Sequence, residues 1–292
     1  MSAGLAWKGV LSVAAILSLS ACGSSSSGSG EPRSSTPAPP ATGQGVFIDS
    51  AVQGLGYESG DVSGFTDANG GFTYTAGEPV TFYVGDTIIG TLTLGVNSGA
   101  VSITPVDLVN GAVDETDETV TNIAQLLQSL DDDRDPSNGI EITQAMHDVA
   151  DQAMDISQLS DADFINQLLY FETIMAQSSA GITDLVEEAD AQAHLQGSLI
   201  TLLAGTYMGT YTGDASGTFT LTFDDDGMIS GQAQDVDGVY ALSGSANSDG
   251  SAAAGTAGDD ATFSGTINNG VFSGTWVNTA YGESGTFTGS LQ

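Results

Sequence analysis

The 292-residue sequence has few of the residues on which disulfides and transition-metal sites depend. It contains one cysteine, Cys22, so the chain forms no intramolecular disulfide and has no cysteine set for a zinc site. Its two histidines, His147 and His194, form no motif of the His-x-x-x-His type. The folded part must therefore be stabilised by packing, with hard cations as a further contribution.

Basic residues are also scarce. The chain has 3 Lys and Arg against 37 Asp and Glu, which gives a formal net charge of −34. Such a surface repels nucleic acid and anionic lipid headgroups, so we expect neither as a partner. It attracts cations, and salt or divalent ions would relax its self-repulsion.

A long hydrophobic run is missing. The longest apolar stretch, Gly9–Leu19, follows Lys8 and is shorter than the roughly 20 residues that a membrane-spanning helix needs. A positive start, a short apolar run and small residues are typical of a secretory signal peptide, here residues 1–21. Cys22 follows this segment directly, and one interpretation is an ordinary signal peptide with an incidental cysteine at that position.

The residues Leu19-Ser20-Ala21-Cys22 resemble the lipobox of bacterial lipoproteins. The resemblance implies cleavage before Cys22, acylation of its thiol and amino group with palmitate-type chains, and anchoring outside the cytoplasm. The residue after Cys22 is Gly23 and not an aspartate. In the lipoproteins that this chain resembles, the absence of aspartate at that position is compatible with the outer membrane of a Gram-negative cell. Residues 22–44 are rich in Gly, Ser and Pro, and we expect them to form a disordered tether.

The segment 45–104 has strand character. Val80, Phe82 and Val84 alternate with more polar neighbours, and Asn69-Gly70 is a turn signal. The phrase Thr66-Asp67-Ala68-Asn69-Gly70-Gly71-Phe72 resembles the small β-sandwiches of the Cna-B or carboxypeptidase-regulatory type, which often act as spacers. A plain antiparallel sheet with an Asn-Gly turn is the alternative.

The segment 105–203 changes to helical period, and we expect a small helical bundle. Apolar spacing predicts four helices, and their ranges are 120–130, 143–154, 164–175 and 183–195.

An acidic loop joins the first two of these helices. Alternate aspartates, a later Asn and Gly139 offer several oxygens to a hard cation, so the loop resembles those of EF-hand calcium proteins. It departs from that motif because Pro136 stands where the glycine is expected and no residue matches the last glutamate. The predicted calcium ligands are Asp131, Asp133, Asp135, Asn138 and Glu141. The alternative is a solvated acidic loop of turn formers and helix caps.

The segment 204–292 repeats a Gly-Thr-aromatic phrase between turn signals, as in Ser273-Gly274-Thr275-Trp276. This predicts an antiparallel meander or barrel of about eight strands. The pattern resembles the small barrels of surface lipoproteins and lipocalin-like proteins. The predicted fold class is therefore a multidomain α+β protein with an N-terminal β-segment, a helical bundle and a C-terminal barrel.

No catalytic constellation stands out, because the chain has no nucleophile-elbow phrase and no Gly-Lys-Ser/Thr phosphate loop. We expect a non-enzymatic surface lipoprotein with a structural or interaction role, whose partner is another surface protein or a glycan. The alternatives are a barrel that encloses a small apolar molecule and, less favoured, a hydrolase that uses surface carboxylates. A lumen closed by aromatic side chains would favour the structural role, and a lined cavity would favour ligand binding. The side chains expected to close it are Phe219, Phe263, Phe272 and Trp276.

Overall fold

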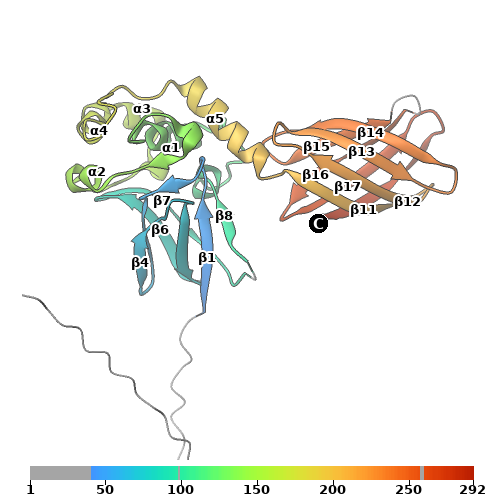
Figure 1. Ribbon diagram of the computed structural model, residues 1–292, viewed down its shortest axis with the longest axis horizontal. Coiled ribbons are helices and arrows are strands. Elements are labelled where there is room, and N and C mark those ends of the chain that lie inside the picture. The colour runs from blue at the N-terminus through green and yellow to red at the C-terminus, as the bar shows by residue number, and fades with distance from the viewer. Residues whose placement is uncertain (1–40, 98, 257–259) are drawn as a thin grey trace, which may run out of the picture. The chain divides into compact units, whose positions relative to one another are not determined.

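The computed structural model describes residues 41–97, 99–256 and 260–292, and it is a mixed α+β protein with N-terminal strands and a C-terminal barrel (Figure 1). The predicted signal peptide, most of the tether and Cys22 lie outside the described residues. The strands before the barrel are β1 (Thr42–Phe47), β2 (Val52–Gln53), β3 (Gly56–Ser59), β4 (Val62–Phe65), β5 (Gly71–Thr75), β6 (Pro79–Val84), β7 (Thr87–Thr93), β8 (Val101–Ile103), β9 (Ile140–Glu141) and β10 (Met154–Asp155).

Two small sheets form the N-terminal part. One has the order β5-β1-β8 and the other β10-β7-β6-β3-β4, while β2 and β9 pair separately. The two sheets meet through aromatic side chains, since the ring of Phe82 lies 4.8 Å from Phe47 and 5.0 Å from Phe72 between centroids. Strand β1 begins at Thr42, inside the segment expected to be tether, because Gly43 and Gly45 leave room for the Tyr74 and Phe72 rings to cross it.

The helical segment contains α1 (Glu118–Ser129), α2 (Gln144–Val149), α3 (Asp161–Ile165), α4 (Leu168–Met175) and α5 (Glu188–Thr201), with single 3-10 turns η1 (Pro105–Leu108), η2 (Pro136–Asn138) and η3 (Ile156–Gln158). Helix α1 matches its prediction, and Asp117 caps it by accepting from the backbone of Thr119 and Val120. Its apolar side chains join those of both sheets in one core, so segments 45–104 and 105–185 are packed together.

Three predicted helices differ from the structure. Helix α2 ends at Val149 because the chain is needed for the sheet: the Ala150 carbonyl accepts from Asp86, and Met154 pairs with Thr87. The helix predicted over 164–175 is broken at Asn166–Gln167 into α3 and α4. Helix α5 starts at Glu188, not 183, and runs on to Thr201.

The C-terminal segment is a closed antiparallel barrel, as the sequence predicts. Its strands run in chain order, each bonded to the next, and the last pairs with the first. They are β11 (Gly205–Gly213), β12 (Gly217–Phe223), β13 (Met228–Gln234), β14 (Val239–Ala246), β15 (Ser251–Thr256), β16 (Ala261–Asn268), β17 (Val271–Asn278) and β18 (Glu283–Leu291) (Figure 1).

Glycines on the inner face make this small barrel possible. Gly209 lies between the buried Tyr207 and Tyr211, and a Cβ there would come 2.6 Å from the Phe219 ring. At Gly285 a Cβ would come 2.5 Å from the indole nitrogen of Trp276. Every barrel strand except β15 has at least one such inward glycine, and examples, one from each, are Gly209, Gly217, Gly231, Gly244, Gly265, Gly274 and Gly285. The repeated glycine therefore allows tight curvature and leaves space for the aromatic rings that fill the lumen.

Among the described residues, no helix is both long and apolar enough to cross a membrane.

Candidate functional site

The acidic loop predicted to bind calcium follows α1 and leads into β9. Asp131 is 1% exposed, although it begins the most acidic stretch of the chain. Its Oδ1 accepts a hydrogen bond from the backbone N–H of Glu141 at 2.9 Å. Its Oδ2 is buried and has no hydrogen-bond partner among the described residues. A buried carboxylate oxygen without a donor is costly, and a proton, a water molecule or a cation would each relieve that cost.

Asp133 lies beside Asp131 and organises the loop. Its Oδ1 accepts from the N–H of Asp135, and its Oδ2 accepts from the amide of Asn138, both at 3.0 Å. The bond from Asn138 is the main reason that the pKa of Asp133 is lowered. Burial raises the pKa of Asp131 to about 6; the Glu141 N–H partly offsets this effect, and the charge of Asp133 adds to it.

The other predicted ligands have different positions. Asp135 caps the η2 turn, since its Oδ1 accepts from the N–H and hydroxyl of Ser137. The Glu141 carboxylate accepts from the Gln53 side chain at 3.2 Å, so only its backbone contacts Asp131. The loop therefore brings together Asp131, Asp133 and Asn138 and directs the Glu141 carboxylate elsewhere.

Arg134 lies within the loop, and its guanidinium donates to backbone carbonyls and to no carboxylate of the described residues. Its backbone has a φ of 63°, a conformation that glycine adopts more easily. Its guanidinium donates to the carbonyls of Ser129 at 2.7 Å and Asp184 at 2.6 Å. Arginine has no preference for positive φ, so no local signal revealed this turn. As a result, no ion pair neutralises the carboxylates of the loop in the part of the chain that the structure describes.

Across the described ranges, no cluster of three or more His, Cys, Asp and Glu side chains is arranged to hold a metal ion. A cation at this loop would therefore rest on Asp131 and Asp133, together with amide, backbone and water oxygens. Calcium accepts such a mixed oxygen set. Two carboxylates leave most of the coordination shell to neutral oxygens, and the calcium ligands stay a prediction.

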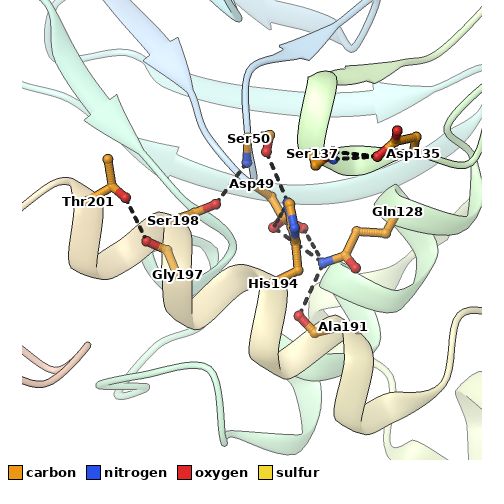
Figure 2. Close-up of polar contacts among 10 residues, drawn as sticks. All are labelled: Asp49, Ser50, Gln128, Asp135, Ser137, Ala191, His194, Gly197, Ser198 and Thr201. Atoms are coloured by element: carbon orange, nitrogen blue, oxygen red, sulfur yellow. Dashed lines mark hydrogen bonds and ion pairs between the residues drawn. The ribbon is translucent and has the colours of Figure 1, made fainter. Parts of the chain in front are cut away.

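A second polar cluster joins the end of β1 to α1 and α5, and no sequence pattern indicated it (Figure 2). Asp49 is fully buried, and Gln128 Nε2 donates to both its oxygens, at 3.3 and 3.0 Å, and to the Ala191 carbonyl at 3.2 Å. Burial raises the pKa of Asp49 to about 7, and the bonds from Gln128 oppose that rise. Its partners are 79 and more residues away in sequence, so local patterns could not reveal them.

Ser50, His194 and Asp49 lie together, but not as a catalytic relay. The Ser50 hydroxyl lies 3.0 Å from His194 Nε2, and Asp49 Oδ1 lies 3.8 Å from the same nitrogen. A relay needs the acid and the nucleophile on opposite ring nitrogens. Ser50 has a φ of 57°, and its N–H donates to the Ser198 hydroxyl, which fixes the turn onto α5 (Figure 2). The cluster is best explained as a buried polar connection between β1 and the helices.

His147 in α2 is likewise a connecting residue. Its Nδ1 accepts from the N–H of Gly85 and its Nε2 lies 2.8 Å from the Gly54 carbonyl, so both ring nitrogens are engaged. Burial lowers its pKa, which keeps the ring neutral. Neither histidine is paired with the other.

The barrel lumen is filled at its centre. The predicted closing side chains Phe219, Phe263, Phe272 and Trp276 are all buried. Phe287 joins them, 5.5 Å from Phe263 and 4.6 Å from Phe272 between ring centroids. Aromatic side chains therefore occupy the centre of the lumen.

No family model and no curated protein matches this chain.

Proposed function

We propose that this protein is a membrane-anchored surface lipoprotein with a structural or interaction role, and that calcium bound at Asp131 and Asp133 stabilises its N-terminal folded part. One observation carries the calcium proposal: the buried Oδ2 of Asp131 has no donor in the part of the chain that the structure describes. The binding partner is expected to be another surface protein or a glycan.

The position of the loop explains why calcium would stabilise the fold. Asp131 directly follows α1, which packs in the core, and its Oδ1 holds β9 through the Glu141 N–H. Strand β9 pairs with β2, so the loop connects a helix of the core to the sheet side. A cation site here would exist only when α1 and β9 are in place, so the cation would bind and stabilise only the folded state.

A thermal melt tests this proposal on the chain without residues 1–22. Calcium at about 100 times its dissociation constant stabilises by roughly 2.7 kcal/mol, so we expect the melting temperature of the N-terminal part to rise by roughly 5–10 °C. Trp276 is the only tryptophan left after this removal. Its fluorescence therefore follows the barrel, whose melting should not change, while circular dichroism follows both parts.

Two matched variants separate a bound ion from general screening of charge. Asp131→Asn keeps the acceptor for the Glu141 N–H but removes the buried charge, so it should abolish the calcium response. Asp132→Asn removes a charge from the next residue, whose carboxylate accepts from Ser179 on the other side of the loop. This control should keep the response. Equal responses of the two variants, or equal melts in calcium and in chelator, would refute the calcium site.

The lipid anchor is tested separately. Expressed in a Gram-negative host, the chain should partition into the detergent phase and incorporate labelled palmitate, whereas Cys22→Ala should appear in the aqueous phase without label. Detergent partitioning of Cys22→Ala equal to that of the parent would show that Cys22 is not the anchor.

A further inference from the structure

One end of the barrel contains a pocket. The aromatic side chains that fill the lumen form its floor. The volume of the pocket is about 400 Å³, in the range of small-molecule sites. It lies where β11, β13 and β17 end and β14 and β18 begin. Aromatic and acidic side chains line it together with alanines, a threonine and an asparagine. Those that bear on binding are Tyr211, Trp276, Tyr281, Asp235, Asp237 and Glu283.

Aromatic rings form the inner wall. Tyr211, Phe263 and Trp276 are each no more than 5% exposed. Trp276 stacks on Phe263 with centroids 6.4 Å apart, and Tyr211 and Trp276 form a T-shaped pair with centroids 5.6 Å apart. The indole N–H of Trp276 donates to the Thr212 carbonyl at 3.1 Å, which fixes the ring. Tyr281 is 73% exposed and belongs to the rim.

Carboxylates without basic partners form the outer wall. The segment 204–292 contains no Lys, Arg or His, so Asp235, Asp237 and Glu283 have no cationic side chain of the barrel beside them. Asp235 is fixed in place: its Oδ1 accepts from the N–H groups of Asp237 and Gly238, and its Oδ2 accepts from the Tyr211 hydroxyl at 3.3 Å. Burial, together with the charge of Asp235, raises the pKa of Tyr211 to about 12, so the phenol stays neutral.

We propose that this pocket binds a small organic cation that carries an alkylated ammonium group. The faces of Trp and Tyr rings attract such a cation, and carboxylates at the rim add charge attraction. The same carboxylates repel anions. A neutral apolar ligand would displace water from them and offer no positive charge in return. A bare metal ion would find no ligands on the aromatic wall. This inference does not depend on the calcium loop or on the lipid anchor.

Choline is a suitable probe, and its neutral isostere 3,3-dimethylbutan-1-ol is the matched control ligand. Because Trp276 lines the pocket and is the only tryptophan once residues 1–22 are removed, its fluorescence reports binding directly. At constant ionic strength we expect a saturable change with choline and at least roughly tenfold weaker binding of the isostere.

Two variants of the barrel make the test specific. Asp235→Asn keeps the Oδ1 acceptor of its turn but removes the charge, and it should weaken choline binding several-fold. Asp249 holds the β14–β15 turn in the same way, by accepting from the N–H of Ser251, but it does not line the pocket. Asp249→Asn should therefore leave choline binding unchanged.

Four outcomes would overturn the proposal. No saturable change with choline, or equal affinity for the isostere, would show that the cation is not what is recognised. Equal weakening by Asp235→Asn and Asp249→Asn would show that the effect is general charge attraction. Saturable binding of neutral sugars that is insensitive to Asp235→Asn would instead make this a glycan pocket.

Discussion

Replacing Gly274 by alanine is expected to lower the melting temperature of the barrel by roughly 15 °C, because overpacking of this kind costs about 3 kcal/mol. Gly274 lies on the inner face of β17, directly opposite Gly265 of β16. A Cβ at this position would come 2.5 Å from the Gly265 Cα and press on the Ser264 carbonyl. Those atoms are backbone, so the strands themselves must move apart. Trp276 fluorescence, two residues away, measures the transition.

Gly255→Ala is the matched control for this prediction. Gly255 is also in a barrel strand, β15, but its Cβ would meet the Ala261 carbonyl at 3.4 Å and Thr262 Oγ1 at 3.7 Å, both ordinary contacts. The control should melt within a few degrees of the parent, since alanine also restricts the unfolded chain more than glycine. If Gly274→Ala melts like Gly255→Ala, the inner glycines are not needed for the closure of the barrel.

The barrel could be predicted from the sequence because its determinants are local. Every strand carries its own glycine, most strands carry bulky residues at period two, and four of the seven turns carry an Asp-Gly or Asn-Gly signal. Sequential pairing needs no long-range information. What the repeat did not reveal is that glycines and rings are complementary across strands, as at Gly209 and Phe219.

The N-terminal part was less predictable because long-range contacts determine it. The stretch before α5 has helical apolar spacing but is extended, since the Val186 N–H donates to the Ser129 hydroxyl and its carbonyl accepts from Gln125. The start of β1 at Thr42 depends on rings contributed by β5. Such tertiary interactions override local propensity, so periodicity alone placed these boundaries incorrectly.

The candidate calcium site was likewise predictable only in its local part. The spacing of the aspartates identified the loop, but not which carboxylate is buried. The burial of Asp131 follows from the packing of α1 against the sheets, and the direction of Arg134 follows from a carbonyl at Asp184, distant in sequence. Composition therefore located the loop, and the fold determined its chemistry.

The second large effect that we expect is a pH-dependent gain in stability from Asp49→Asn, which grows by about 3 kcal/mol between pH 5 and pH 9. Burial raises the folded-state pKa of Asp49 from 3.8 to about 7. Between these values the folded protein keeps a proton that the unfolded chain has released. The contribution of this proton to stability is complete below pH 3.8 and is lost as the pH rises through 7. Asparagine carries no charge at any pH, so the variant does not show this loss.

The groups that face Asp49 decide how the experiment is controlled. Gln128 donates to both carboxylate oxygens, and His194 Nε2 lies 3.8 Å from Oδ1. Burial lowers the pKa of His194, whereas the Asp49 backbone and the charge of Asp135 raise it, so His194 contributes stability with the opposite dependence on pH. Urea unfolding should therefore be measured at pH 5, 7 and 9 for two pairs of proteins. The first pair is the parent and Asp49→Asn, and the second is His194→Gln and the double variant that carries both substitutions. The gain at pH 9 should survive in the His194→Gln background.

An exposed carboxylate serves as the control for net charge. Asp61 lies in the exposed turn between β3 and β4, and Asp61→Asn removes one negative charge from the same part of the molecule. This variant should follow the parent at all three pH values, because an exposed charge on a strongly acidic surface changes stability only slightly. A gain at pH 9 of the same size in Asp61→Asn and Asp49→Asn would mean that relief of surface repulsion is the cause. A gain confined to Asp49→Asn would identify the buried carboxyl as the group that destabilises the fold at alkaline pH.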